Sequence, residues 1–564
     1  MNLLLGKRTI HLAGCGTRQL LARRVKVAGR KGCHQYLRAW RSTLPLIYLS
    51  PASSAHQAAL HRKAMLRNLA SPFSTSRGHP SRGIASARPH TSVAWMLRQK
   101  PTDAAHAQFL GLDKVVINGY IQSIRNQKQR SFAAIGDGSS MQTLQALLTP
   151  EQARGVSYGC AVRLTGSWKP SLKPSIQSHE LHVSRLDLVG PTNTSYPLQK
   201  KYQSPEYLRT MPHLRSRIPF NAALLRFRSD AIAIVTKTLS EMAFVQTHTP
   251  IITSSDCEGA GEVFHVSTAS KGKPRGPEDD FFRSPKYLTV SSQLHLEALS
   301  QSVGKVWTLS PSFRAERSDT TRHLSEFYQL EAEMSFVESM DDVMHLIRSI
   351  LTPIARSLGT SQTGQDLLYA SDQKEELRGR WHGITLDWKR ITYTEAIKNL
   401  QASTHIFEHE PKWAAGLQTE HEKYIAQMVG VNARHVTPVF VTHYPRLLKP
   451  FYMLSSAESE AEGETVDCFD LLVPDFCEIA GGSMREHRLQ PLLAAMLQRK
   501  LIPSLEPSDD QLRDLKWYVD LRKWGSVPHG GFGLGFDRIL GYMAGVPHVR
   551  EMVTFPRWVG RCDC

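Results

Sequence analysis

The sequence predicts an α+β protein in which a small N-terminal β-barrel precedes a larger domain of strands and helices. Five short runs rich in β-forming residues follow one another from Asp113 onward, within roughly 80 residues. A helical repeat of apolar residues then spans Phe220 to Met242, and two strands joined by a polar turn follow it. With 564 residues, 41% of them hydrophobic, the chain is long enough for two or three domains.

The first hundred residues differ from the rest in charge. They hold 18 of the 69 Lys and Arg and no Asp or Glu, which leaves 51 basic against 51 acidic residues in the remainder. This acid-free composition, with amphipathic spacing from Leu20 to Val27, is typical of a mitochondrial transit peptide; a basic RNA-binding tail is the alternative. We expect residues 1–96 to be a transit peptide and disordered linker, and the protein to act in the mitochondrial matrix. No run reaches the ~18 apolar residues of a membrane span, so no stable membrane association is expected.

The five β-rich runs begin at Val115, Arg130, Leu144, Ala161 and Glu180. Five strands of this length fit an OB-fold, whose sheet face binds single-stranded nucleic acid. Any small barrel would show a similar alternation. We assign this domain to residues 97–191 and a polar hinge to residues 192–215.

The predicted hairpin at residues 307–331 combines residue types that bind nucleotides. Side chains alternate along a strand, so Arg314 and Glu316 are expected on one face of the first strand. Phe327, Gln329 and Glu331 are expected to share one face of the second strand. A guanidinium suits phosphate, an aromatic ring suits a purine, and a carboxylate suits an ammonium or exocyclic amine. The hairpin therefore predicts an ATP site, although an isolated Arg-x-Glu would be better explained by a salt-bridged surface hairpin.

Three further segments have informative patterns. Pro250 interrupts a predicted strand at residues 244–252, and because proline cannot donate to a ladder it belongs at an edge or an interface. Carboxylates in residues 470–486 could meet the preference of Mg²⁺ for one or two carboxylates beside phosphate oxygens. The glycine-rich segment at residues 528–540 would let a nucleotide approach the backbone, and it continues into a helix whose N-terminus favours phosphate.

Taken together, these segments resemble the class II aminoacyl-tRNA synthetases, in the subgroup that charges aspartate, asparagine and lysine. Phe-Arg-Ala-Glu followed by Arg-His-Leu-x-Glu-Phe-x-x-Leu-Glu is similar to motif 2 of that family. The long helix and the strand ending in Pro250 are similar to motif 1, and residues 528–540 to motif 3. The resemblance covers residue 113 to the C-terminus. It implies an anticodon-binding OB-fold and a catalytic domain at 216–564, an antiparallel sheet flanked by helices, with an insertion at about 341–423.

The resemblance also implies the reaction. Ser-Asp-Cys-Glu-Gly-Ala-Gly-Glu and Gly-Gly-Ser-Met-Arg-Glu are similar to asparaginyl members of the subgroup. Such a ligase activates asparagine with ATP to asparaginyl-adenylate and transfers it to the 3′ end of tRNA-Asn, here for mitochondrial translation. Three alternatives remain: an aspartyl-tRNA synthetase, an ammonia-dependent asparagine synthetase that should lack the barrel, and a non-catalytic RNA-binding relative that should have lost Arg314, Glu478 or Arg538.

Individual residues take their expected roles from the same resemblance. Arg314 and Arg538 would act in catalysis, and the ATP contacts would be Arg314, Glu316, His323, Phe327, Glu478 and Arg538. Glu478 and Asp470 would hold Mg²⁺, with Asp475 as the alternative for the second ligand. The asparagine contacts would be Glu258, Gln293 and Arg485, and the anticodon contacts would be Arg125, Phe132 and Gln145. Pro250 would lie at a homodimer interface. The sequence does not identify the acceptor that reads the asparagine NH₂ opposite Arg485.

Overall fold

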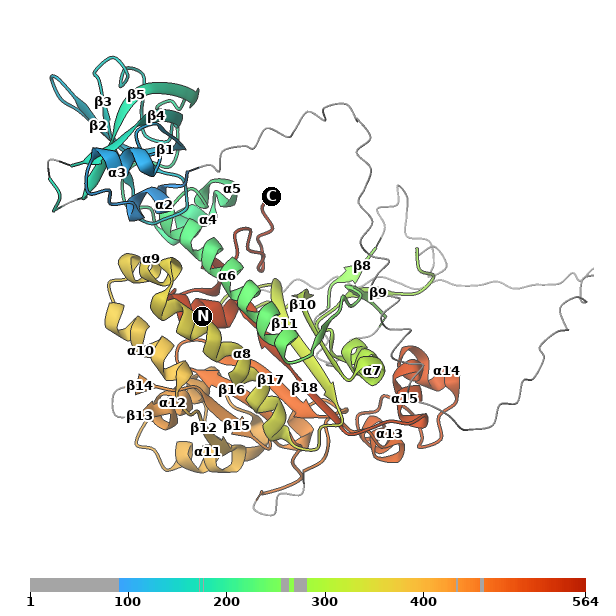
Figure 1. Ribbon diagram of the computed structural model, residues 1–564. Helices are drawn as coiled ribbons and strands as arrows, with labels where there is room; N and C mark the ends of the chain where they lie inside the picture. Colours follow the sequence, from blue (N-terminus) through green and yellow to red (C-terminus); the bar gives the residue numbers. More distant parts are fainter. Residues whose placement is uncertain are drawn as a thin grey trace, which may run out of the picture. The chain divides into compact units, whose positions relative to one another are not determined.

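The computed structural model describes residues 91–171, 173–175, 177–254, 263–267, 281–432, 435–456 and 461–564. Residues 1–90 of the predicted leader and the loop with Glu258 lie outside these ranges. Within them, the chain forms a closed five-stranded barrel and an eight-stranded sheet covered by helices (Figure 1). The predicted α+β class is therefore confirmed. Among the helices that the structure describes, none is both long and apolar enough to cross a membrane.

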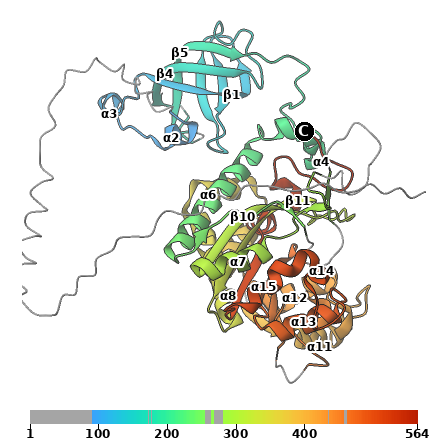
Figure 2. The ribbon, with the colours of Figure 1, turned by 90° about the vertical axis from the view of Figure 1, so that its right-hand side faces the viewer.

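The barrel consists of β1 (Val115–Asn126), β2 (Ser131–Gly136), β3 (Leu144–Leu148), β4 (Ala161–Pro170) and β5 (His179–Gly190), which close in the order β1-β2-β3-β5-β4 (Figure 2). Only β3 and β5 pair in parallel. This closure is consistent with the predicted OB-fold. Helices α2 (Val93–Arg98) and α3 (Ala104–Phe109) precede the barrel. Because Val93 and Met96 are fully buried in the barrel core, the expected boundary at residue 96 falls inside α2, and the barrel domain includes residues before 97.

The larger sheet has the strand order β12-β15-β16-β17-β18-β11-β10-β6. Its strands are β12 (Lys389–Thr392), β15 (Val439–Thr442), β16 (Cys468–Val473), β17 (Cys477–Met484), β18 (His529–Gly535), β11 (Glu326–Ser335), β10 (Lys305–Phe313) and β6 (Val245–Gln246). The six central strands pair antiparallel. The two outermost pairs, β12 with β15 and β10 with β6, are parallel. The predicted antiparallel sheet is thus confirmed, with one parallel pair added at each edge.

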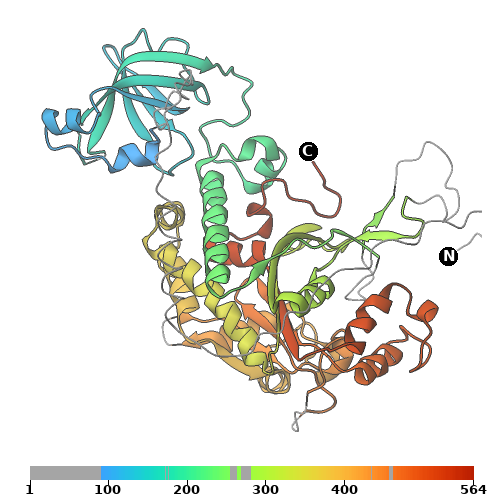
Figure 3. The same ribbon diagram turned by 45° about the vertical axis from the view of Figure 1, so that its right-hand side comes forward.

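Helices cover both faces of this sheet, as Figure 3 shows for α6 and α8 (green and yellow) on one side and the red helices α13 to α15 on the other. The main helices are α6 (Pro219–Glu241), α7 (Gln293–Val303), α8 (Met340–Thr360), α9 (Gln362–Ala370), α10 (Lys374–Thr385), α11 (Tyr393–Gln401), α12 (Thr419–Gly430), α13 (Leu489–Gln498), α15 (Lys516–Lys523) and α16 (Phe536–Ala544). Shorter helices are α4 (Pro205–Arg209), α5 (Pro212–Arg215) and α14 (Asp509–Leu512). One apolar core includes side chains of α6, α8, α10 and α16, and a second includes side chains of α11, α12, α13 and α15.

The alternation of side chains along β11 decides which residues face the open part of the sheet. Leu330, Ala332 and Met334 pack into the first apolar core. The positions between them therefore point to the opposite face, where Glu331 and Glu333 stand. The predicted grouping of alternate residues on this strand is confirmed, and it extends two residues further than the hairpin we considered.

Glycines of β18 leave room above that face. The strand pairs antiparallel with β11 and places Gly533 opposite Glu331 and Gly531 opposite Glu333. A Cβ atom on Gly531 would lie 2.0 Å from Oε2 of Glu333, so no larger residue fits beside that carboxylate. Glycine in β18 thus leaves space for the carboxylate of Glu333, in addition to allowing a ligand to approach the backbone.

Two expectations about this domain differ from the structure. The strand expected at residues 244–252 is divided into β6 and β7 (Ile252–Thr253), and the exposed Pro250 lies between them. β7 pairs with β9 (Lys286–Leu288), which also pairs with β8 (His265–Val266), in a separate small sheet. The expected insertion at 341–423 begins with α8, whose apolar side chains form a large part of the main core. This part of the chain is therefore integral to the fold.

Candidate active site

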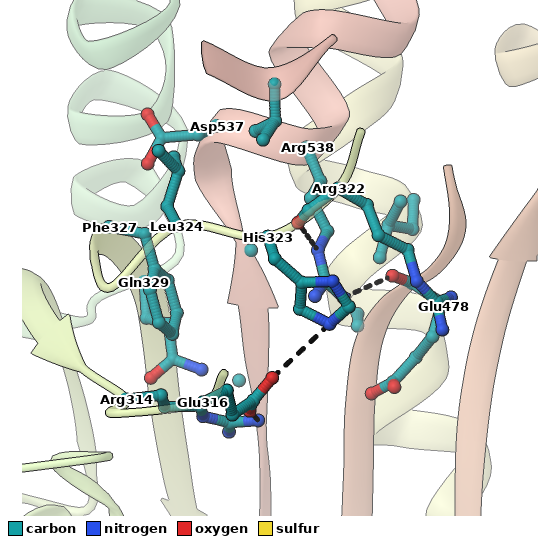
Figure 4. A pocket seen from close by; sticks show the side chains of 15 residues that line it. Arg314, Glu316, Arg322, His323, Leu324, Phe327, Gln329, Glu478, Asp537 and Arg538 are labelled. Atoms are coloured by element: carbon teal, nitrogen blue, oxygen red, sulfur yellow. Dashed lines mark hydrogen bonds and ion pairs between the residues drawn. The ribbon is translucent and has the colours of Figure 1, made fainter. Parts of the chain in front are cut away.

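A cavity of about 180 Å³ lies at the junction of β11, β17, β18 and the start of α16 (Figure 4). We call it the first cavity. It is lined by Arg314, Glu316, Arg322, His323, Leu324, Phe327, Gln329, Glu478, Ile479, Ala480, Gly533, Gly535, Asp537, Arg538 and Val549. All six residues that the sequence predicted as ATP contacts are in this set, although the positions of Arg314 and Arg538 are 224 residues apart in the chain.

Arg314 enters the first cavity from the loop after β10 instead of from the strand itself. β10 ends at Phe313, so the expectation that Arg314 and Glu316 share a strand face was wrong. The backbone N–H of Arg314 still donates to the carbonyl of Ser325 at 3.0 Å, which holds the loop against the start of β11. The guanidinium carbon lies 5.8 Å from the ring centre of Phe327. Nη1 of Arg314 lies 3.7 Å from Oε1 of Glu316, so the two side chains meet although no strand aligns them.

The side chain of His323 lies beside that of Glu316 in the lining of the first cavity. Its Nε2 atom lies 3.3 Å from Oε2 of Glu316, and Nδ1 lies 2.6 Å from the hydroxyl of Thr320. Burial and the nearby arginines lower the pKa of His323, against the opposing pull of Glu316. The imidazole is therefore neutral at neutral pH. A bound anion at this place would favour its protonation.

Arg538 lies deep in the first cavity, in the first turn of α16. Its Nη1 donates to the carbonyl of Glu478 at 2.9 Å, and its Nε donates to the carbonyl of Arg322 at 3.3 Å (Figure 4). Burial lowers the pKa of Arg538 and Glu478 opposes that shift, but an arginine remains charged. The next residue along the chain toward the N-terminus, Asp537, accepts from the backbone of Tyr328 at 2.8 Å and thereby ties α16 to β11.

Three arginines line the first cavity together with the carboxylates of Glu316, Glu478 and Asp537. Arg322 joins Arg314 and Arg538, and its guanidinium is held by Glu422 at 2.9 Å and by the hydroxyl of Thr419 at 2.7 Å. Sequence reasoning did not assign a role to Arg322, although it precedes His323 in the same motif. Three guanidinium groups in a partly desolvated space, beside a helix N-terminus, provide donors for a polyphosphate.

A second cavity of about 300 Å³ adjoins the first. It shares Arg314, Gln329, Glu478 and Gly533 with the first cavity, and the other lining residues are Ser291, Gln293, Leu296, Glu331, Ala332, Glu333, Leu448, Lys449, Pro450, Tyr452, Met453, Asp470, Gly481, Gly482, Arg485 and Phe532. Since Arg314 and Glu478 line both cavities, a ligand in one can react with a ligand in the other at their junction.

Arg485 and Glu333 form a buried ion pair in the wall of the second cavity. Nε of Arg485 lies 3.2 Å from Oε1 of Glu333, and Nη2 lies 3.0 Å from Oε2, so the contact is bidentate. Nη1 of Arg485 donates to the hydroxyl of Ser483 at 2.6 Å. Both charged side chains are at most 2% exposed. Sequence reasoning missed Glu333, although continuing the alternation of β11 by one more step would have placed it beside Glu331.

The carboxylates of Asp470 and Glu478 converge on Gly481. An oxygen of each lies 3.3 Å from the position that a Cβ atom on Gly481 would occupy. Nζ of Lys449 binds both oxygens of Asp470, at 2.8 and 2.7 Å. Burial alone would raise the pKa of Glu478, but Lys449 and three arginines outweigh burial and lower it. Burial raises the pKa of Asp470 despite Lys449.

This pair of carboxylates fits a Mg²⁺ ion that also binds phosphate. Within the described ranges, no group of three or more His, Cys, Asp or Glu side chains could hold a metal ion. A site made of one or two carboxylates needs its other oxygens from a ligand or water, as Mg²⁺ sites for nucleotides do. Glu478 is the more available carboxylate because Lys449 engages both oxygens of Asp470. Asp475, the alternative ligand, is 55% exposed, pairs with Arg380 at 2.8 Å and lines neither cavity.

Gln293, which the sequence predicted as an asparagine contact, begins α7 and lines the second cavity. Its Nε2 donates to Oε1 of Glu297 at 3.0 Å. The preceding turn is held by Glu331, which accepts from the hydroxyl of Ser291 at 2.5 Å and from the backbone of Ser292. Glu258, the other residue expected in this pocket, lies outside the described residues.

The three expected anticodon contacts lie on the outer surface of the barrel. Phe132 on β2 and Arg125 on β1 are register partners, and the guanidinium carbon lies 5.3 Å from the ring centre. Phe132 is half-buried and lies outside the barrel core. Gln145 on β3 also points outward, but its Nε2 donates to Glu180 at 2.7 Å.

Comparison with known protein families shows the class of protein to which this chain belongs. The family model described as tRNA synthetases class II (D, K and N) matches residues 204–559, which is more than half of the chain. The chain therefore belongs to this family of class II tRNA synthetases.

Individual relatives show which members of this family the chain is similar to. The mitochondrial asparagine–tRNA ligase of Schizosaccharomyces pombe is 40% identical over 454 residues, which cover 79% of this chain and 94% of the relative. The mitochondrial enzyme of the same name from Saccharomyces cerevisiae is 39% identical and covers 79% of this chain and 92% of its own length. The crystal structure of asparaginyl-tRNA synthetase from Pyrococcus horikoshii complexed with asparaginyl-adenylate matches with a TM-score of 0.68 and 27% identity, over 82% of this chain and 99% of that one. Within the family, the chain groups with the asparagine–tRNA ligases.

Proposed function

We propose that this protein activates asparagine with ATP and transfers the asparaginyl group to tRNA-Asn in mitochondrial translation. The relatives named above support this activity, two of them as mitochondrial enzymes. The observation that carries the proposal is the junction of the two cavities. A cavity rich in arginine meets a cavity with a buried Arg485–Glu333 pair, and Arg314 and Glu478 line both.

In the first step, ATP occupies the first cavity. Arg314 binds the α-phosphate at the junction, while Arg538 and His323 bind the γ-phosphate end. The adenine ring lies between Phe327 and Arg538, and Glu316 accepts from its exocyclic amine. The asparagine carboxylate attacks the α-phosphorus, a new P–O bond forms, and the bond to pyrophosphate breaks. The chain then contributes positioning and charge stabilisation, and no protein nucleophile is needed. Glu478 and Asp470 would hold a Mg²⁺ ion, whose charge would offset the negative charge of the phosphates.

Selection of asparagine depends on donors and acceptors in the second cavity. An amide side chain has one acceptor and one donor group, whereas a carboxylate has acceptors only. Arg485 donates to the side-chain carbonyl of asparagine, and Glu333 accepts from its NH₂. Aspartate would place a carboxylate against Glu333, and mispairing of this kind can discriminate by about 10⁴ to 10⁵. Gln293 and Glu258 complete the pocket, with Glu258 on the α-ammonium.

In the second step, the terminal ribose 3′-hydroxyl of the tRNA attacks the carbonyl of asparaginyl-adenylate. The barrel binds the anticodon through Phe132, which stacks on a base, and through Arg125 and Gln145 at base edges. The barrel also argues against an ammonia-dependent asparagine synthetase, which has no use for such a domain. A non-catalytic relative is disfavoured because Arg314, Glu478 and Arg538 are all present and close together.

The protein acts as a homodimer with Pro250 at its interface. The exposed Pro250 is followed by Ile251 and Ile252, each 42% exposed, and Val245 nearby in the chain is 46% exposed. Contact with a second chain would cover these exposed apolar side chains. The acid-free leader directs the protein to the mitochondrial matrix. Import of the full chain into isolated mitochondria tests this part of the proposal.

The activity is tested by ATP–pyrophosphate exchange with the full chain and asparagine, aspartate or lysine. We expect exchange with asparagine alone and its loss in Arg314→Ala. Exchange with aspartate would reassign the protein to the neighbouring synthetase. Folded protein that exchanges with none of the three would favour an RNA-binding role.

A further inference from the structure

A cluster of buried polar side chains lies behind the second cavity and takes no part in the mechanism above. Its members are Glu297 on α7, Tyr518 and Arg522 on α15, and His529 at the start of β18. The side chains of Glu297, Arg522 and His529 are 0% exposed. Burying charged groups so completely is unfavourable unless they are paired and hydrogen-bonded, so their arrangement needs an explanation.

Glu297 is the centre of this cluster. Its Oε2 accepts from Nη2 of Arg522 at 2.6 Å and from the hydroxyl of Tyr518 at 2.7 Å, and it lies 3.1 Å from Nε2 of His529. Burial would raise the pKa of Glu297, but Arg522, His529 and Arg485 outweigh burial and lower it. Glu297 is therefore an ionised carboxylate whose second oxygen, Oε1, is turned toward Gln293.

This contact determines the orientation of the Gln293 amide. The two ends of a glutamine amide have nearly the same shape, so only hydrogen-bond partners decide which end points where. An ionised carboxylate accepts hydrogen bonds and cannot donate them. The NH₂ group of Gln293 must therefore face Oε1 of Glu297, at 3.0 Å. The carbonyl oxygen Oε1 of Gln293 is then the end that remains for a ligand in the second cavity.

We propose that Glu297 is a positioning residue of the amino-acid pocket, which makes Gln293 present a hydrogen-bond acceptor to the substrate. Arg522, Tyr518 and His529 hold Glu297 in place from the far side. An acceptor at this place suits the ammonium or amide NH₂ of asparagine. If the amide of Gln293 rotated, its NH₂ would instead suit a carboxylate. This inference rests on the proposed activation of asparagine in the second cavity.

The test is pyrophosphate exchange by the full chain carrying Glu297→Gln. A glutamine at 297 can offer either its carbonyl or its NH₂ to Gln293, so the orientation is no longer imposed. We expect the KM for asparagine to rise about tenfold or more, the scale of losing a hydrogen bond to a charged group. The KM for ATP should stay within about twofold, because the first cavity does not include Gln293. An unchanged KM for asparagine would overturn the proposal.

A double-mutant cycle with Gln293→Ala distinguishes a positioning role of Glu297 from a purely structural role. If Glu297 acts through Gln293, adding Glu297→Gln to Gln293→Ala should leave the KM for asparagine almost unchanged. An equal further rise in the double variant would show that Glu297 acts elsewhere and would overturn the proposal. Glu551→Gln is the matched control, since Glu551 is also buried and paired, with Arg209 and Arg215, but lines neither cavity.

Glu297→Gln leaves Arg522 without its ionic partner and could unfold the protein. The double variant Glu297→Gln, Arg522→Gln removes both charges together. Removing both partners of a buried ion pair destabilises a protein less than removing one of them. This folded variant should show the same rise in the KM for asparagine, and a wild-type KM would overturn the proposal. Wild-type exchange with asparagine is the reference for every variant. A failure of the proposed function would therefore appear in the wild type, whereas a failure of this inference would appear only in the variants.

Discussion

Glu333→Gln should weaken the discrimination between asparagine and aspartate. The carboxylate of Glu333 makes two contacts with Arg485, at 3.2 and 3.0 Å, and both side chains are almost fully buried. Glutamine has the same shape but keeps only one acceptor and adds a donor. Asparagine thus loses an ionised acceptor for its NH₂, whereas aspartate gains a donor for its carboxylate.

The magnitude follows from the kind of hydrogen bond that is lost. A hydrogen bond to a charged group contributes about 1.5–3 kcal/mol, so kcat/KM for asparagine should fall roughly 10- to 150-fold. If aspartate gains about tenfold from the new donor, the ratio of the two kcat/KM values should fall by about 10² to 10³. Burial raises the pKa of Glu333 and Glu297 adds to the shift, whereas Arg485 opposes it through the bidentate contact. We infer that Glu333 is ionised at neutral pH.

The assay is ATP–pyrophosphate exchange with each amino acid at saturating ATP. Glu331→Gln is the matched control, because Glu331 lies on the same strand face as Glu333 and accepts from Ser291 and Ser292. It should affect both amino acids alike and leave their ratio unchanged. Thermal melts of each variant separate lost stability from lost recognition. A ratio that stays at the wild-type value in Glu333→Gln, with folded protein, would refute the role of Glu333.

Three further predictions concern other parts of the protein. Phe132→Ala should raise the KM for tRNA by about 5- to 150-fold, since base stacking contributes about 1–3 kcal/mol; pyrophosphate exchange without tRNA is the control and should not change. Glu478→Gln should increase the Mg²⁺ concentration needed for half-maximal exchange at least severalfold, whereas an unchanged Mg²⁺ dependence would exclude Glu478 as a ligand. Burial, Arg550 and Arg209 lower the pKa of His548 to about 4, so unfolding takes up a proton between pH 6.5 and 4. The Tm of the wild type should therefore fall as the pH decreases through this window, and it should fall less in His548→Asn; equal slopes for the two proteins would argue against this assignment.

Much of the site was predictable because its residues lie in short segments with clear periodicity. The alternation of β11 follows from local sequence and places its acidic residues on one face. The glycines of β18 and the apolar stripe of α6 are local patterns as well. The register of β16 and β17 bears on the choice between Asp470 and Asp475 as a predicted Mg²⁺ ligand. β16 and β17 pair so that Asp470 lies opposite Gly481 and near Glu478, whereas Asp475 falls in the turn between these strands.

The α+β class, the barrel, the helix of motif 1 and the segments that supply the arginines of the first cavity could be predicted from the sequence, because these features depend on side-chain periodicity and composition within a few residues. The pairing of charged groups, in contrast, depends on how distant parts of the chain pack together. Glu333 and Arg485 are 152 residues apart, and Glu297 and Arg522 are 225 apart. Such pairs form because the order and register of the strands, and the docking of α15 against α7, bring these side chains together in the buried interior. In that environment, an unpaired charge would be strongly destabilising, so partner choice is a property of the folded core.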